Sequence, residues 1–145
     1  MTDAQVEPLD APVETFASFP IHPQIVEALA DAGITHPFPI QSMTLPVALG
    51  GHDIIGQAKT GTGKTLGFGI PLLNRVVSPS DEAWADFRHP GKPQALAVAP
   101  TRELAVQVAG DLERAAAKRG IRVLTVYGGR AYEPQVEALK RGVEV

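Results

Sequence analysis

Residues 53–65 read Asp-Ile-Ile-Gly-Gln-Ala-Lys-Thr-Gly-Thr-Gly-Lys-Thr, and this stretch decides the fold. Residues 53–58 are typical of a short strand, and residues 64–76 are predicted to form a helix. The glycine-rich loop between them ends in Gly-Lys-Thr. Glycines let successive backbone N–H groups converge on phosphate oxygens, and the positive end of a helix adds to the attraction. The sequence therefore predicts a phosphate-binding loop.

Lys64 and Thr65 close this loop and are our candidate catalytic residues. The ammonium group of Lys64 would reach the β and γ phosphates of a nucleotide, and the hydroxyl group of Thr65 would ligate Mg²⁺. The general pattern has glycine where Ala58 stands, so the loop is a variant. An ordinary glycine-rich turn is the alternative interpretation. The order of strand, loop and helix favours nucleotide binding.

The sequence after the loop alternates apolar runs with helical stretches. A proline-containing loop over 78–93 precedes the continuous apolar run 95–99, which is typical of a strand covered on both faces. We predict a helix over 102–119, a third strand over 121–127 and a further helix over 134–141. Strands that alternate with helices demand right-handed crossovers and a parallel sheet. The predicted fold class is therefore α/β, doubly wound, with helices flanking a parallel sheet.

The amino-terminal part divides into a tail and two short helices. Residues 1–15 have few bulky apolar groups and several acids, so we expect a disordered acidic tail. From His22 the apolar spacing predicts a helix that Gly33 ends, and residues 40–49 predict a second helix. The expected folded part is thus residues 16–145.

Composition narrows the class of protein. The chain has 145 residues, of which 44% are hydrophobic and 20% charged, as in one globular domain or a piece of one. It has no cysteine, which excludes a disulfide scaffold, a thiolate zinc site and a cysteine nucleophile. No apolar run reaches the roughly 18 residues that span a bilayer, and the acidic amino terminus is unlike a signal peptide. We expect a soluble, cytoplasmic protein with no membrane partner.

Charge is unevenly distributed along the chain. The formal net charge is −3, yet all 13 Lys and Arg residues follow residue 58. A basic second half would suit phosphate-bearing ligands. Chance together with an acidic tail explains the asymmetry equally well. The four histidines show no metal-ligand spacing, so we expect surface or capping roles for them.

Three further motifs accompany the phosphate-binding loop in a fixed order. Pro-Thr-Arg-Glu-Leu-Ala occupies residues 100–105, a Gly-Gly pair occupies 128–129, and Gly-Ile-Thr-His-Pro-Phe-Pro-Ile-Gln occupies 33–41, with Phe16 as an isolated aromatic 17 residues before its first glycine. Together they resemble the DEAD-box RNA helicases over residues 16–145. The resemblance implies the amino-terminal portion of a RecA-like ATP-binding domain. Alanine is the usual residue at position 58 in that family.

The resemblance implies a role for each residue of the nucleotide site. The amide of Gln41 would pair with the edge of adenine and so select ATP over GTP. Phe16 would stack on the adenine face, or alternatively anchor the first helix in the core. Ile34 and Phe38 depart from the Phe and Thr that the family usually has. The implied ATP and Mg²⁺ site consists of Phe16, Gln41, Ala58, Thr60, Gly61, Thr62, Gly63, Lys64 and Thr65.

The resemblance also implies contacts to the RNA sugar-phosphate backbone, which are independent of sequence and sensitive to salt. The implied RNA-binding residues are Pro100, Thr101, Arg102, Gly128 and Gly129. For Arg102 a surface ion pair is the alternative. The basic cluster Arg114, Lys118, Arg119 and Arg122 could be a solvated helix end or an RNA track.

Members of the family continue with an Asp-Glu-Ala-Asp acid motif and a second RecA-like domain, neither of which lies in residues 1–145. We therefore expect the parent protein to be an ATP-dependent RNA helicase and this chain to bind ATP and RNA without turnover. We also expect apolar sheet edges to be unpaired. The alternatives are a DNA helicase or other phosphate-loop ATPase of the same superfamily, and a non-catalytic nucleotide- or RNA-binding fragment.

Overall fold

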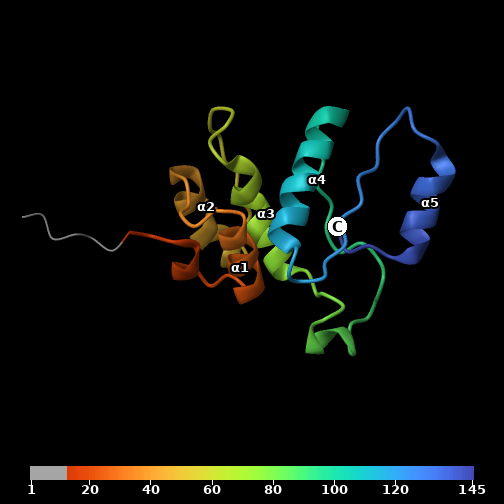
Figure 1. Ribbon diagram of the computed structural model, residues 1–145, viewed down its shortest axis with the longest axis horizontal. Coiled ribbons are helices and arrows are strands. Elements are labelled where there is room, and N and C mark those ends of the chain that lie inside the picture. The colour runs from red at the N-terminus through yellow and green to blue at the C-terminus, as the bar shows by residue number, and fades with distance from the viewer. Residues whose placement is uncertain (1–12) are drawn as a thin grey trace, which may run out of the picture.

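Four helices form the body of the structure, a computed structural model that describes residues 13–145 (Figure 1). Helix α3 packs between α2 and α4, and α1 packs on α4. Helix α5 lies apart from α4 and buries none of its residues. The elements in chain order are η1 (Phe16–Ser18), α1 (Pro23–Asp31), α2 (Pro39–Leu49), α3 (Lys64–Arg75), η2 (Glu82–Trp84), α4 (Arg102–Ala116) and α5 (Tyr132–Arg141).

Each helix begins near its predicted position. Pro23 opens α1, and Nδ1 of His22 accepts a hydrogen bond from the Gln24 backbone N–H at 3.3 Å, as the capping role requires. Helix α4 ends three residues before the predicted end at Arg119, and α5 starts two residues before Pro134. Glu14 already accepts a hydrogen bond from Ser42 Oγ at 2.6 Å, two residues before the expected boundary. The remainder of the predicted tail, residues 1–12, lies outside the described residues.

The hydrophobic core gathers around α3. A Cβ on Gly69 would meet Cδ2 of Leu112 at 2.7 Å, so the absence of a side chain at this position lets α3 and α4 approach closely. Burial of these apolar side chains is the main contribution to stability. The largest apolar side chains that are fully buried are Phe16, Ile25, Leu29, Leu45, Ile70, Leu73 and Leu112.

Residues of the basic cluster near the end of α4 form ion pairs with acidic side chains. Arg119 is 2% exposed, and its Nη2 donates to the Val76 carbonyl at 2.8 Å and to Oδ2 of Asp81 at 2.9 Å. Lys118 pairs with Asp31 at 2.7 Å, and Arg122 pairs with Glu144. Arg119 is thus a buried structural residue, so a solvated helix end is wrong for it, and the pairs of Lys118 and Arg122 occupy charges that an RNA track would need.

The three segments predicted as strands do not form regular strands, and no β-strand lies within residues 13–145. A strand requires a neighbour that completes its hydrogen-bond ladder. Two segments have such a neighbour over a few residues. Ala95 N–H donates to the Glu144 carbonyl at 3.2 Å, Leu124 N–H donates to the Val145 carbonyl at 2.9 Å, and the Arg122 carbonyl accepts from the Glu144 N–H at 3.1 Å. Residues 144–145 thus bond to both segments, so the predicted sheet is present here only as these few ladder bonds.

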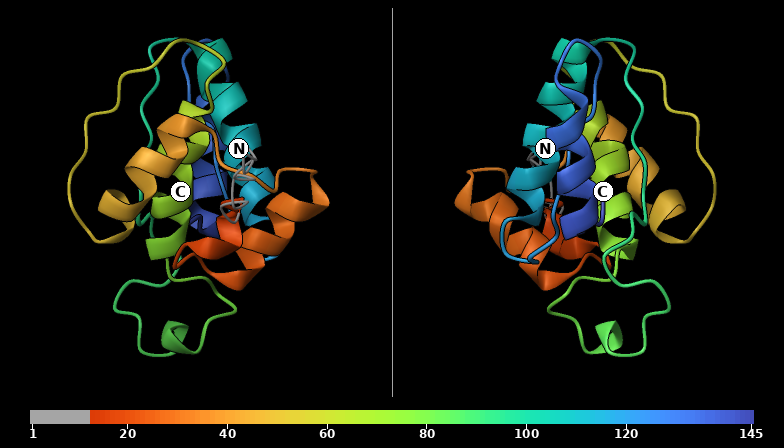
Figure 2. Two further views of the ribbon diagram at one scale, coloured as in Figure 1. Left: turned by 90° about the vertical axis from the view of Figure 1, so that its left-hand side faces the viewer. Right: turned by 90° about the vertical axis from the view of Figure 1, so that its right-hand side faces the viewer.

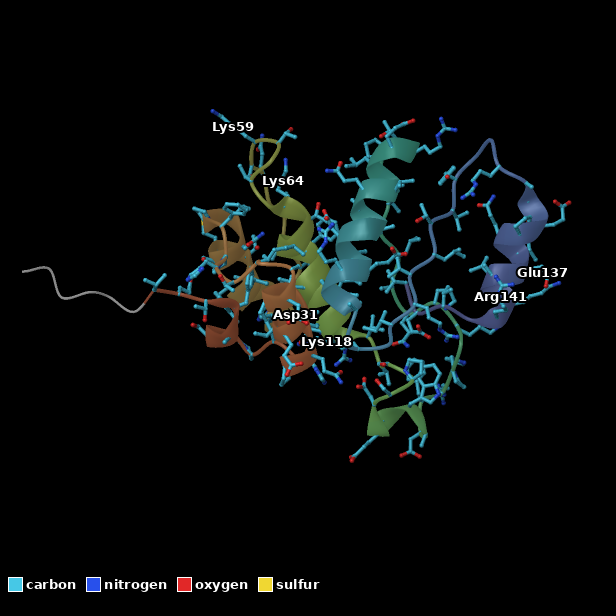
Figure 3. All side chains as sticks on the ribbon, in the orientation of Figure 1. Asp31, Lys59, Lys64, Lys118, Glu137 and Arg141 are labelled. Atoms are coloured by element: carbon cyan, nitrogen blue, oxygen red, sulfur yellow. The ribbon has the colours of Figure 1, made fainter. Side chains whose placement is uncertain are left out.

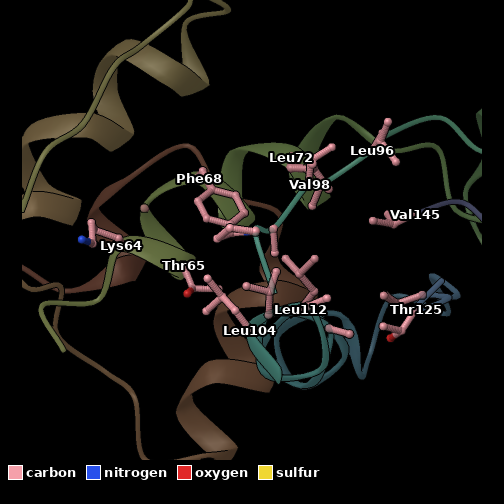
Figure 4. Close-up of a pocket in the computed structure, with 18 of the residues that line it drawn as sticks. Lys64, Thr65, Phe68, Leu72, Leu96, Val98, Leu104, Leu112, Thr125 and Val145 are labelled. Atoms are coloured by element: carbon pink, nitrogen blue, oxygen red, sulfur yellow. The ribbon is translucent and has the colours of Figure 1, made fainter. Parts of the chain in front are cut away.

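An apolar cavity of about 680 Å³ lies beside the unpaired segments (Figure 4). Its walls come from α3, α4 and the segments around Leu96 and Thr125. Leu96 is 85% exposed, Val98 is 86% exposed and Ile55 is fully exposed. The expectation that apolar segments are left without neighbours is confirmed by these exposures.

The loops that carry the predicted site gather at one end of the molecule. The phosphate-binding loop above α3, the start of α4 and the loop before α5 all lie at the upper end in Figure 1, and the views of Figure 2 agree. The loop over 79–93, with η2, lies at the opposite end. The fold thus brings the nucleotide and RNA motifs to the same edge.

Candidate nucleotide and RNA site

Gly63 forms the junction between the phosphate-binding loop and α3. It is the N-cap of α3 with φ 81°, a left-handed conformation that L side chains rarely adopt. A Cβ at this position would lie 2.3 Å from Nε2 of Gln41 and 2.7 Å from Cδ2 of Phe38. Glycine is therefore required here both for the backbone conformation and for close contact with the start of α2.

Gln41 links that segment to the phosphate-binding loop. Its side chain is 1% exposed, its Nε2 donates to the Gly63 carbonyl at 2.9 Å, and its Oε1 accepts from the Phe38 N–H at 2.9 Å. A primary amide has two hydrogens and two oxygen lone pairs, so one donor and one acceptor remain after these bonds. Adenine recognition by Gln41 stays a prediction, and its position beside the loop fits that role.

Hydrogen bonds within the phosphate-binding loop join its two ends, and Figure 3 shows the side chains of Lys59 and Lys64 extending from it. The Lys64 ammonium donates to the carbonyl of Ala58 and so spans the loop from its end to its beginning. Thr62 Oγ1 donates to the Lys59 carbonyl at 2.6 Å. Thr60 and Gly61 are exposed. The structure therefore brings Ala58 and residues 60–64 together as one loop.

Thr65 begins the first turn of α3 and lies with Lys64 at the wall of the cavity (Figure 4). Its hydroxyl oxygen is the kind of hard ligand that Mg²⁺ prefers, and the helix N-terminus beside it attracts phosphate. Among residues 13–145 no group of three His, Asp or Glu side chains could hold a metal ion. A metal ion at Thr65 would therefore not be held by a group of three such side chains among these residues.

Phe16 lies away from this loop, in the hydrophobic core. Its side chain is 1% exposed, and its N–H donates to the Thr35 carbonyl at 3.2 Å. The ring packs in the same cluster as Ile25 and Leu29 of α1. This position corresponds to the alternative role, an anchor for α1. Stacking on adenine would require one face of the ring to become uncovered.

The predicted RNA motif at the start of α4 contains a helix cap and an exposed cation. Thr101 is the N-cap of α4, where its Oγ1 accepts from the Leu104 N–H at 3.2 Å. Arg102 follows with 56% of its side chain exposed, and its Nη2 lies 3.5 Å from Oε1 of the exposed Glu103. Pro100 lines the cavity. The surface ion pair predicted as the alternative for Arg102 is present, but such an exposed pair contributes little.

The Gly-Gly loop lies next to Arg102. A Cβ on Gly128 would meet nothing within 4 Å, whereas a Cβ on Gly129 would lie 3.9 Å from Nη1 of Arg102. The guanidinium carbon of Arg102 lies 5.9 Å from the ring centroid of Tyr127. The structure thus brings the two predicted RNA motifs together, with a tyrosine between them.

Arg130 joins this group, and the sequence reasoning missed it. Its guanidinium carbon lies 5.3 Å from the centroid of the Tyr127 ring. The signal available in the sequence was its position directly after the Gly-Gly pair. That position alone does not show that the side chain turns back towards Tyr127.

The fold perturbs the titration of His22. Burial lowers its pKa from 6.5, the positive charge of Arg119 lowers it further, and Asp81 partly opposes both effects. His36 has a separate contact, in which its Nδ1 shares a hydrogen bond with Thr35 Oγ1 at 2.8 Å. The capping role expected of the histidines is confirmed for His22.

No helix within residues 13–145 is both long enough and apolar enough to cross a membrane.

Known proteins resemble this chain in sequence. The family model described as DEAD/DEAH box helicase matches residues 38–145. The ATP-dependent RNA helicase RhlB of Xanthomonas oryzae pv. oryzae is 50% identical over 131 residues, which are 90% of this chain and 22% of that protein. RhlB of Pectobacterium carotovorum subsp. carotovorum is 42% identical over 132 residues, 91% of this chain and 30% of that protein. The chain spans less than a third of the length of these two relatives.

Solved structures resemble it in fold. A DEAD box protein from the hyperthermophile Methanococcus jannaschii superimposes with a TM-score of 0.76 at 32% identity, over 90% of this chain and 33% of that one. The RNA helicase Prp28 from Chaetomium thermophilum, bound to ADP, superimposes with a TM-score of 0.71 at 34% identity. The match covers 86% of this chain and 29% of that one. The α/β RecA-like fold class is confirmed by these matches. Because the family model covers well over half of the residues, the chain belongs to the DEAD/DEAH box helicase family.

Proposed function

We propose that this chain is the ATP-binding lobe of an ATP-dependent RNA helicase. The observation that carries the proposal is the hydrogen bond from Gln41 Nε2 to the Gly63 carbonyl. This bond puts an amide with donor and acceptor capacity directly beside the last glycine of a phosphate-binding loop. The names of the relatives, ATP-dependent RNA helicases, and the ADP bound to Prp28 support the same function.

In this proposal, different residues bind different parts of the nucleotide. The backbone N–H groups of residues 60–63 and the N-terminus of α3 bind phosphate oxygens. Lys64 exchanges its bond with the Ala58 carbonyl for the β and γ phosphates. The Thr65 hydroxyl holds Mg²⁺, which when bound neutralises charge on the phosphates. Gln41 selects adenine.

The RNA backbone would contact the same edge through two loops. Pro100, Thr101 and Arg102 lie at the start of α4, and Gly128 and Gly129 lie beside Arg102. Exposed backbone N–H groups and a guanidinium group suit phosphates and carry no base specificity.

A cytoplasmic location belongs to the same proposal, because ATP and RNA would be its ligands.

Binding without hydrolysis is the expected behaviour of residues 1–145. Phosphoryl transfer needs a carboxylate that holds Mg²⁺ and orients the attacking water. No Asp or Glu of residues 13–145 lines the cavity beside Lys64 and Thr65. Measured phosphate release should therefore equal that of a Lys64→Ala variant, and faster release by the parent chain would contradict this part of the proposal.

The test of nucleotide binding is a titration with a fluorescent adenosine nucleotide and Mg²⁺, competed with ATP and with GTP. We expect ATP to compete better than GTP and Lys64→Ala to abolish binding. Lys59→Ala is the matched control, because Lys59 lies in the same loop and its side chain forms no ion pair among residues 13–145. Equal loss in both variants would indicate only a general charge effect.

Gln41→Ala tests the specificity. We expect it to remove the preference for ATP over GTP. Circular dichroism should accompany this variant, since the buried amide also bonds to Phe38 and Gly63. A folded Gln41→Ala protein that still prefers ATP would overturn the assignment of adenine recognition to Gln41.

A further inference from the structure

The ring of Tyr127 has two guanidinium groups within cation–π distance. The guanidinium carbon of Arg130 lies 5.3 Å from the ring centroid, and that of Arg102 lies 5.9 Å from it. The ring itself is half-buried, whereas both arginines are exposed. Two cations from different loops, Arg102 at the start of α4 and Arg130 in the loop before α5, thus share one aromatic partner.

The backbone of this loop is fixed by α5. Oε1 of Gln135 accepts a hydrogen bond from the Tyr127 N–H at 3.3 Å, and Nε2 of the same side chain donates to the Ala131 carbonyl at 3.1 Å. These two bonds hold both ends of the Gly128–Arg130 turn. Arg130 therefore extends from a constrained turn and not from a free loop.

Arg130 has no carboxylate partner in the part of the chain that the structure describes. The ion pairs formed by residues 13–145 involve Arg102, Arg114, Lys118, Arg119, Arg122 and Lys140. The Arg102 pair is long, at 3.5 Å, and both of its side chains are exposed. The positive charge around Tyr127 is therefore poorly compensated within the protein.

We propose that Arg130 is a third phosphate-binding group for RNA at this edge, and that Tyr127 is the positioning residue that holds it beside Arg102. The inference rests on the proposed function, because it extends the RNA contacts of residues 100–102 and 128–129. An exposed cation–π contact is weak, so the ring orients the two guanidinium groups and leaves their N–H donors available. Their mutual repulsion is relieved when a phosphate binds between them.

The chemistry of the group favours phosphate over a neutral ligand. A guanidinium group presents a planar fork of donors that matches phosphate oxygens bidentately. Its stacking on Tyr127 restricts the side chain before binding, which reduces the entropy lost on association. Contacts of this kind are independent of base sequence.

The test measures the affinity of this chain for a labelled single-stranded RNA by fluorescence anisotropy over a series of salt concentrations. We expect Arg130→Ala to weaken binding about tenfold. The slope of log K against log salt should fall in magnitude by about 0.7, the value for one lost phosphate contact on a single strand. Arg88→Ala is the control, because it removes the same charge from the loop at the opposite end and should change neither quantity.

Tyr127 is tested by two substitutions. Tyr127→Phe keeps the ring and should bind RNA as the parent does, whereas Tyr127→Leu should weaken binding several-fold. Equal affinities for Tyr127→Leu and Tyr127→Phe would overturn the positioning role. If Arg130→Ala binds RNA as tightly as Arg88→Ala does, while Arg102→Ala binds more weakly, the role of Arg130 alone is overturned. If the parent chain fails to bind RNA, or Arg102→Ala binds normally, the proposed RNA edge fails and this inference fails with it.

Discussion

At the scale of the residue, Gly63 shows how one missing side chain supports the nucleotide loop. Gly63→Ala would force a Cβ to 2.3 Å from Gln41 Nε2 in a left-handed backbone. Gly61 has nearly the same φ, 82°, but a Cβ added there would meet nothing within 4 Å. We therefore expect Gly61→Ala to cost only about 1 kcal/mol of unfolding free energy, from backbone strain. We expect Gly63→Ala to lose at least about 2 kcal/mol of unfolding free energy, and also nucleotide affinity. Denaturant unfolding and nucleotide titration of both variants check this, and similar losses would refute the steric argument.

His22 provides a second prediction at this scale. Because burial and Arg119 lower its pKa from 6.5, the unfolded chain binds the proton more tightly than the folded chain. The stability contributed by neutral His22 is complete above the unfolded pKa and is lost as the pH falls from about 6.5 towards the lowered folded pKa. His22→Asn keeps an N-cap but does not titrate there. Thermal melts at about pH 7.5 and about pH 5.5 should therefore differ less in His22→Asn than in the parent. An equal difference would exclude His22 as a source of pH dependence.

At the scale of the element, Arg119, which follows α4, is bound to the segment after α3 by hydrogen bonds and by an ion pair with Asp81. Asp81 Oδ2 accepts from Arg119 Nη2 at 2.9 Å and from the Ser78 N–H at 2.7 Å, with Arg119 2% exposed. Asp81→Ala leaves that guanidinium buried without a carboxylate, so we expect a loss of about 3 kcal/mol.

The same substitution at Asp31 is the matched control for this prediction. Asp31 pairs with Lys118 at 2.7 Å, but the two side chains are 65% and 39% exposed. Asp31→Ala should cost less than about 1 kcal/mol of unfolding free energy, because exposed ion pairs contribute little. Urea unfolding of both variants measures the difference. Equal stabilities would show that burial does not strengthen the Asp81 pair.

At the scale of the whole molecule, the exposed apolar segments predict association of this chain in solution. Leu96 and Val98 are 85% and 86% exposed, and they lie at the wall of the cavity of about 680 Å³. Large exposed apolar patches and unpaired backbone promote association. Sedimentation velocity should show oligomers that the double variant Leu96→Gln, Val98→Gln reduces. A monomer with one sharp thermal transition would contradict this prediction.

The sequence was sufficient for features that depend on local chemistry. Pro23 and His22 specify the start of α1, and Thr101 specifies the start of α4, because a cap is satisfied by neighbours a few residues away. The phosphate-binding loop before α3 and the RecA-like fold class were predicted from the order of motifs around Lys64. That order is a property of the chain itself and does not depend on distant contacts.

Tertiary structure alone decided which distant groups meet. The apolar run 95–99 resembles a strand, but a strand exists only where another segment completes its hydrogen bonds, and residues 144–145 supply this only at its start. Phe16 lies in the core because helix packing closes over it. Gln41 reaches Gly63, and Arg102 reaches the Tyr127 ring, across separations that no local pattern encodes. The sequence by itself determined the loop, the caps and the family, because these depend on neighbouring residues. The packing of α2, α3 and α4 determined the site, because its contacts join residues that lie far apart along the chain.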